Sequence, residues 1–121
     1  MSKWKLTGDE AQQKQLTAIL RSLGYNEALR GTEYLREAVW LYEPRMRFTK
    51  ELYPELGKLL GVRPACVERN IRTATGRAFN ACTDYEAQEN VFGAMSDTGE
   101  VPTVGQTIAH IWRAVLEGVG A

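Results

Sequence analysis

The sequence predicts an all-α fold of about six helices in one compact domain that contains a helix-turn-helix. Apolar residues recur at helical spacings of three and four, prolines and glycines stand where helices would begin and end, and no stretch alternates apolar and polar residues over five or more positions. The chain has 121 residues, 44% of them hydrophobic and 25% charged, which suffices for one ordinary core. We therefore expect a single domain over residues 1–121, without internal repeats or linkers.

A first helix is predicted over residues 8–23. Thr7 and Glu10 have the spacing of a capping box, which would start this helix. Residues 1–7 are expected to be frayed, with Trp4 as their only anchor. The helical spacing of the apolar side chains predicts that four of them enter the core: Leu16, Ile19, Leu20 and Leu23.

A second helix is predicted over residues 32–43, after Gly24 and a connector over residues 25–31. This segment is rich in good helix formers, and Pro44 follows it as a stop. The predicted core face consists of Leu35, Ala38, Val39 and Tyr42, and Trp40 and Leu41 widen it.

Two helices joined by a very short turn are predicted between residues 52 and 79. Pro54 is placed to open the first helix, because proline lacks only an N–H group that the first helical turn leaves unpaired. Gly61 is placed to end it, since a left-handed conformation costs glycine little, and Pro64 then opens the second helix. Thr49 is a candidate cap for a single turn before Pro54, where we expect a kink or a fresh start.

The second of these helices, at about residues 64–79, has two contrasting faces. Apolar side chains spaced by four, three and four residues form the predicted core face: Val67, Ile71, Ala74 and Ala78. The opposite face carries Ala65, Glu68, Arg69, Arg72 and Gly76. A short helix, a tight turn and a second helix with arginines on its outer face are what a helix-turn-helix needs to contact the major groove of DNA.

Two more helices are predicted in the C-terminal third. The first runs from about Asp84 to Phe92, and a turn-rich loop follows at residues 96–102. Thr103 is expected to cap a last helix over residues 104–117. His110 lies beside core positions of this helix and is expected to be partly buried and structural. The predicted core residues of the helix are Ile108, Ile111, Trp112 and Val115.

The charges are distributed unevenly along a chain whose net charge is zero. Residues 45–77 contain eight basic and three acidic residues, whereas the residues after 77 contain one basic and six acidic residues, and the first 44 residues balance. The zero net charge argues mildly against a nucleic-acid partner, but a basic segment that coincides with a helix-turn-helix favours one. The alternative is that the basic surplus is an ordinary solvated face.

No enzymatic function is indicated. The sequence has no glycine-rich phosphate loop, no nucleophile elbow and a single histidine, so we expect no catalytic site, cofactor, metal or small-molecule substrate. Cys66 and Cys82 lie without a metal-ligand pattern around them and are expected to be reduced thiols. No apolar run approaches the ~20 residues of a membrane span and no signal peptide is recognisable, so we expect a cytoplasmic protein without membrane contact.

Several short motifs, in this order, resemble the DNA-binding effector domain of the sporulation master response regulators, the stage 0 sporulation protein A family. The motifs are Leu23-Gly24, GTEYLREAV at residues 31–39, TKELYP at residues 49–54, VERNIR at residues 67–72, Phe92-Gly93 and Pro102-Thr103. The resemblance spans about residues 23–116, and it rests on the order of the motifs more than on any one of them. It implies a compact six-helix domain that binds a short promoter box, often as tandem copies on DNA.

Residue roles follow from this resemblance at matching positions. Glu68, Arg69 and Arg72 correspond to family residues that face the bases, and their chemistry suits cytosine and guanine contacts. A plain alternative is a solvated helix face with an i, i+4 pair between Glu68 and Arg72. The family prototype has serine, arginine and histidine at three weaker contact positions, where this chain has Ala65, Cys66 and Thr73. The resemblance therefore implies an altered box or weaker binding.

The sequence thus predicts a DNA-binding transcription regulator of bacterial cytoplasm, associated with the nucleoid when it is bound to DNA. Lys58 and Arg63 are candidates for phosphate contacts, and a second copy or RNA polymerase are further possible partners. The alternative is a protein-interaction module that kept the fold but does not bind DNA specifically. Such a module would dock on a receiver-bearing relative or on RNA polymerase, through its acidic C-terminal third or the exposed apolar part of the last helix. A receiver domain precedes the effector domain in the family, and 121 residues leave no room for it, so we expect either an excised domain or a stand-alone relative.

Overall fold

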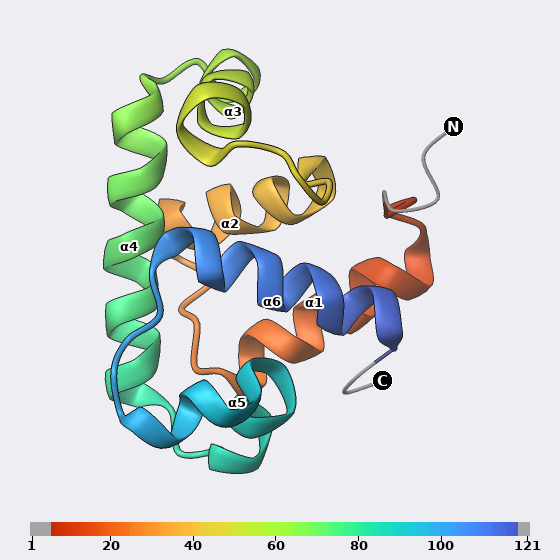
Figure 1. Ribbon diagram of the computed structural model, residues 1–121, viewed down its shortest axis with the longest axis vertical. Coiled ribbons are helices and arrows are strands. Elements are labelled where there is room, and N and C mark those ends of the chain that lie inside the picture. Colours follow the sequence, from red (N-terminus) through yellow and green to blue (C-terminus); the bar gives the residue numbers. More distant parts are fainter. Residues whose placement is uncertain (1–5, 119–121) are drawn as a thin grey trace.

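The computed structural model describes residues 6–118, which form six α-helices, one π-helical segment and one 3-10 helix (Figure 1). The elements are α1 (Glu10–Ser22), α2 (Arg30–Leu41), η1 (Phe48–Leu52), α3 (Tyr53–Leu60), α4 (Pro64–Ala81), α5 (Tyr85–Phe92), η2 (Gly93–Thr98) and α6 (Val104–Glu117). No strand occurs among these residues, and the predicted all-α fold is confirmed. In the described part of the chain, no helix combines the length and the apolar character that crossing a membrane requires.

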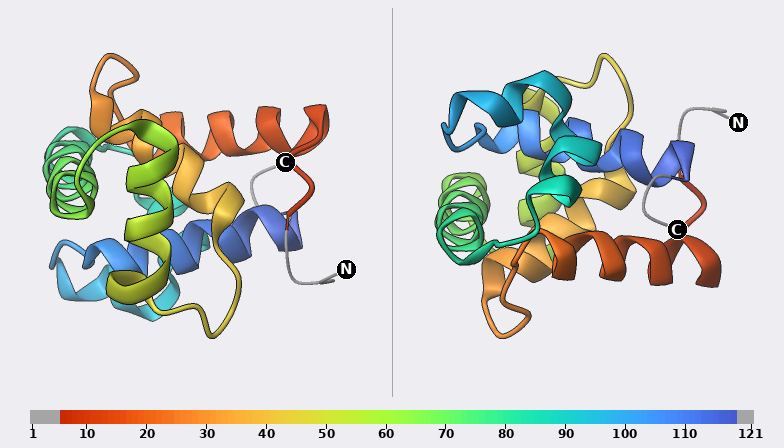
Figure 2. Two further views of the ribbon diagram at one scale, coloured as in Figure 1. Left: turned by 90° about the horizontal axis from the view of Figure 1, so that it is seen from above. Right: turned by 90° about the horizontal axis from the view of Figure 1, so that it is seen from below.

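The helices surround one core, with α4 along one edge of the molecule. Figures 1 and 2 show that α1 and α6 run antiparallel to each other, and that the start of α1 and the end of α6 lie on the side farthest from α4. No other helix covers the outer side of α4 in these views. The twelve predicted core residues of α1, α4 and α6 are all buried: Leu16, Ile19, Leu20, Leu23, Val67, Ile71, Ala74, Ala78, Ile108, Ile111, Trp112 and Val115.

Helix α1 begins two residues later than predicted and has a different cap. The side chain of Asp9, not that of Thr7, accepts a hydrogen bond from the backbone N–H of Gln12 at 2.9 Å. Asparagine and aspartate are stronger caps than threonine, and Asp9 is closer to the first apolar turn. The expected fraying of residues 1–7 is wrong for Leu6, whose side chain is buried in the core. The predicted anchor Trp4 lies outside the described residues.

Helix α2 begins and ends two residues earlier than predicted. Its first turn includes Gly31, which had been expected in a connector, and it ends at Leu41, well before Pro44. The chain leaves the helix at Tyr42, whose ring stacks on Phe48 with 5.6 Å between ring centroids and meets Trp112 edge-on at 5.4 Å. The residue that follows the last turn of α2 is thus held by ring contacts with η1 and α6.

The segment before α3 forms a π-helix rather than a capped single turn. Thr49 lies inside this segment and does not cap it, and the Glu51 carboxylate accepts a hydrogen bond from the backbone N–H of Arg47 at 2.8 Å instead. The π-helix passes directly into α3, so the expected break before Pro54 is absent, although Pro54 does lie in the first turn of α3. The wider π turn places Leu52 in the core, where it is fully buried.

The C-terminal helices follow the predictions closely. Asp84 caps α5 by accepting a hydrogen bond from the N–H of Ala87, and Thr103 caps α6 in a reciprocal capping box with Gln106. The bounds of α6 are those predicted. Two details differ: α4 extends to Ala81, and residues 93–98 form η2 where a loop was expected from residue 96. His110 is half-buried beside Phe92, as predicted.

Candidate nucleic-acid interface

A glycine-ended turn joins α3 to α4. Gly61 adopts the left-handed conformation with φ of 72°, and the backbone N–H of Val62 donates to the carbonyl oxygen of Gly57 at 3.0 Å. A Cβ atom on Gly57 would lie 2.6 Å from the carbonyl oxygen of Val62, so the turn can fold onto α3 only where residue 57 is glycine. Pro64 then occupies the first turn of α4. The roles predicted for Gly61 and Pro64 are confirmed.

Two glycine contacts set the position of α4 against α1 and α2. A Cβ atom on Gly31 of α2 would overlap the carbonyl group of Asn70, at 2.6 Å from its carbon. Gly24, after α1, has φ of 88°, and a Cβ atom there would lie 2.8 Å from the carbonyl oxygen of Ala78. The backbone of α4 therefore lies directly against two glycines, and its inner apolar face is fixed toward the core. The opposite face must point outward.

The structure places all eight predicted contact residues at the surface or partly exposed. Six are exposed and two are half-buried. The exposed ones are Lys58, Arg63, Ala65, Arg69, Arg72 and Thr73, and the half-buried ones are Cys66 and Glu68. Lys58 lies in the last turn of α3 and Arg63 immediately precedes α4, so both lie at the turn of the helix-turn-helix.

Two grooves flank the outer face of α4, and each is lined by two of the eight predicted contact residues. Ala65 and Glu68 line a groove of about 660 Å³ formed with η1, the start of α3 and the start of α6. Arg69 and Thr73 line a second groove of about 420 Å³, together with Arg30 at the start of α2. Glu68 and Arg69 are neighbours in sequence but face different flanks of the helix.

Glu68 and Arg72 are brought together as an ion pair one helical turn apart. Arg72 Nε donates to Glu68 Oε1 at 3.1 Å, and Arg72 Nη2 donates to Glu68 Oε2 in a second contact. The hydrogen bonds to Glu68 raise the pKa of Arg72. Because the guanidinium is exposed to solvent, such a pair contributes little to stability. Its main effect is to hold a carboxylate and a guanidinium side by side on the outer face of α4.

Tyr53 is a residue of this site that the sequence did not single out. Its ring is buried under the groove that Glu68 lines, and its pKa is raised to about 12, first by burial and then by the charge of Glu68, with Arg72 opposing. Tyr53 therefore lies close enough to Glu68 and Arg72 to be affected by both charges. The motif containing Tyr53 was noted only as part of a family resemblance, and its periodicity alone predicts a core residue.

Cys66 is half-buried and is in contact with the side chain of Asn70, one helical turn further along α4. The side-chain amide of Asn70 donates to the carbonyl oxygen of Cys66 at 2.8 Å and to its sulfur at 3.2 Å. Cys66 and Cys82 are both free thiols, as expected. The Cys66 sulfur thus has a local hydrogen-bond partner within α4.

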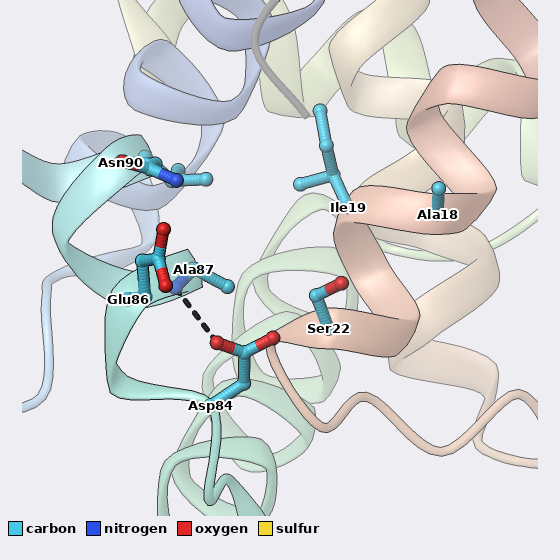
Figure 3. Close-up of a pocket in the computed structure, with 8 residues that line it drawn as sticks. Ala18, Ile19, Ser22, Asp84, Glu86, Ala87 and Asn90 are labelled. Carbon is cyan, nitrogen blue, oxygen red and sulfur yellow. Dashed lines mark hydrogen bonds between the residues drawn. The ribbon is translucent and has the colours of Figure 1, made fainter. Parts of the chain in front are cut away.

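A separate hollow of about 300 Å³ lies between α1 and α5 (Figure 3). Ile19 and Ser22 line it from α1, and Asp84, Glu86 and Asn90 line it from α5. The carboxylate of Asp84 is engaged in capping α5, at 3.0 Å from the N–H of Ala87. Two carboxylates, Asp84 and Glu86, therefore line this hollow, and that of Asp84 already caps α5.

The short helix α3, the glycine-ended turn and the exposed, arginine-bearing face of α4 define a helix-turn-helix domain of the class found in DNA-binding regulators. Residues 16–115 match the family model described as sporulation initiation factor Spo0A, C terminal. The chain belongs to this family, the DNA-binding effector domain of a sporulation response regulator, and the resemblance inferred from its motifs is confirmed.

Proposed function

We propose that this chain binds DNA sequence-specifically and regulates transcription by inserting α4 into the major groove. The observation that carries the proposal is the exposure of Arg69 and Arg72 on the outer face of a helix that lies uncovered along one edge of the molecule. An α-helix fits the major groove of B-form DNA, where each base pair presents a distinct pattern of donors and acceptors.

Three residues are proposed to contact bases. Arg69 and Arg72 can each donate two hydrogen bonds to the O6 and N7 atoms of guanine, and Glu68 can accept one from the N4 amino group of cytosine. Each such contact contributes about 1–3 kcal/mol of discrimination against a wrong base. Because Glu68 and Arg72 are already paired, we propose that they contact adjacent bases as one unit.

Phosphate contacts are proposed for both ends of the interface. Lys58 and Arg63 lie at the turn, where they can reach the DNA backbone. At the other flank, α2 begins beside Arg69 without a side-chain cap at Leu29. The N–H of Thr32 donates to the carbonyl oxygen of Leu29 at 3.1 Å, and we propose that the two N–H groups before it bind a phosphate. Ala65, Cys66 and Thr73 offer fewer contacts than the serine, arginine and histidine of the family prototype. We therefore propose an altered promoter box or weaker binding.

A titration of labelled duplexes tests this proposal. Wild-type protein should bind the promoter box of the family more tightly than a random duplex, and the double variant Arg69→Ala, Arg72→Ala should lose most of that preference. Lys14→Ala, Arg21→Ala is a matched control, because it removes the same charge from exposed positions of α1. If the wild-type and double-variant proteins bind both duplexes equally, base contact by these arginines is wrong.

A second candidate function is a protein-interaction module. It is favoured by the zero net charge and by the exposed acidic face of α5, where the Tyr85 side chain is 71% exposed. RNA polymerase is the proposed partner of such a module. The salt dependence separates DNA binding from an apolar protein contact. Two phosphate contacts, by Lys58 and Arg63, would give a slope of log affinity against log salt of about −2, whereas an apolar protein contact hardly responds.

Two further proposals concern the number of copies that bind to DNA and the location of the protein in the cell. Copies are proposed to bind in tandem on adjacent boxes, and a duplex with two boxes should then bind two copies cooperatively relative to a duplex with one. The proposed location is the bacterial cytoplasm, at the nucleoid when the protein is bound to DNA. Independent binding to each box would contradict a tandem contact.

A further inference from the structure

A groove of about 760 Å³ lies between the end of α6 and the segment that follows α2. The rings of Tyr42 and Trp112 and the side chain of Leu116 give it apolar walls. Leu116 is 38% exposed, so the apolar surface continues from the groove onto the outer side of α6. An occupant must therefore cover both a hollow and a helix face, which suits an elongated partner better than a small molecule.

The charged groups of this groove are mainly positive. Arg45 and Arg113 both line it, and neither forms an ion pair with a carboxylate of residues 6–118. Among the lining residues in the described part of the chain, one carboxylate opposes the two arginines, that of Glu117 in the last turn of α6.

Two further features distinguish the groove from ordinary surface. Arg45 adopts a left-handed backbone conformation with φ of 75°, which is uncommon for a residue other than glycine and tends to occur at functional sites. The indole N–H of Trp112 is buried without a hydrogen-bond acceptor among residues 6–118. A native buried donor without a partner calls for an explanation. Arg45 and Trp112 both line the groove, although the buried indole N–H does not itself open onto it.

We propose that this groove docks an amphipathic helix of a partner protein, with apolar side chains against Tyr42, Trp112 and Leu116 and acidic side chains against Arg45 and Arg113. The charge of the lining selects the acidic partner, and the apolar walls provide the buried contact. The groove lies at the end of α6 farthest from α4. DNA on α4 and a partner helix in the groove can therefore bind at the same time.

The test uses two synthetic peptides and the full chain labelled with ¹⁵N. The acidic peptide is blocked at both ends and has leucines at i, i+3, i+4 and i+7 with glutamates beside them, and its twin has lysine in place of every glutamate. The acidic peptide should shift the Trp112 indole and Arg113 amide resonances, and the twin should not. Arg113→Glu should weaken binding of the acidic peptide by about tenfold or more, whereas Arg77→Glu, an exposed charge reversal on α4, should leave it unchanged.

Several outcomes would overturn the proposal. They are equal binding of both peptides, shifts confined to other parts of the chain, or an unchanged affinity in Arg113→Glu and in the second variant Leu116→Glu. If Trp4→Ala shifts the same resonances in the absence of peptide and lowers stability, the chain itself fills the groove and the proposal also fails. DNA affinity is measured in parallel and should stay within about twofold for Arg113→Glu, since no phosphate contact is assigned to it. A loss of DNA binding alone therefore concerns the proposed function and not the groove.

Discussion

Replacing Gly31 by alanine should destabilise the protein although the new residue is a better helix former. In a free helix the change would gain up to about 1 kcal/mol. Here the added Cβ atom would overlap the carbonyl group of Asn70 and lie 2.8 Å from the Cβ atom of Ala74. The group it meets is backbone, which cannot rotate aside, so α2 and α4 must separate. Overpacking of this kind costs about 1–3 kcal/mol or more, and we expect a net loss of about 1–2 kcal/mol.

The matched control is Gly76→Ala in α4, where no atom lies within 4 Å of the added Cβ. This variant should gain about 0.5–1 kcal/mol, so urea unfolding at one temperature should separate the two variants by about 1.5–3 kcal/mol. Because Gly31→Ala displaces α4, it should also weaken DNA binding. If Gly31→Ala proves as stable as Gly76→Ala, the close contact between Gly31 and Asn70 does not hold α4 in place.

Three other measurements probe the fold. Gly61→Ala should lower the free energy of unfolding in urea by about 1 kcal/mol, because alanine must adopt φ of 72°, and a gain would contradict the left-handed turn. Tyr25→Phe should cost about 1–3 kcal/mol in the same assay, because the buried Thr75 hydroxyl loses a partner at 2.8 Å, and an unchanged midpoint would show that this hydrogen bond contributes nothing. Burial and the charge of Arg113 lower the pKa of His110, so the unfolded chain binds a proton more readily than the folded chain. Thermal stability should therefore fall as pH drops below about 6.5, and this part of the pH dependence should disappear in His110→Gln.

The parts of the fold that the sequence predicted are those governed by neighbouring residues. Gly61 and Pro64 define the turn through their own backbone preferences, and Thr103 caps α6 with a residue three positions away. The register of α4 follows from the spacing of its apolar residues. Such signals act within one or two turns and can be recognised without knowledge of tertiary structure.

The cap of α1 was misjudged between two nearby residues, Thr7 and Asp9, whereas other errors lie where distant segments are in contact. Helix α2 includes Gly31, which packs against the backbone of α4, and it ends at Leu41, just before the ring of Tyr42 meets Trp112. The π-helix before α3 likewise fits Phe48 against Gly105 of α6, where an added Cβ would lie 3.0 Å from the Phe48 ring. For the same reason the sequence identified the outer residues of α4 but not Tyr53 beneath them.

The two glycine contacts under α4 have a consequence for how this domain can change over time. Gly24 and Gly31 meet backbone carbonyl groups of α4, and such groups are the same whatever side chain residue 70 or 78 carries. The position of α4 at these contacts is therefore set by its backbone and by the small side chain of Ala74, which also lies beside Gly31. Substitutions on the outer face, such as those at positions 65, 66 and 73, can then accumulate while the helix keeps its place, and under the proposed function they would alter the preferred DNA sequence.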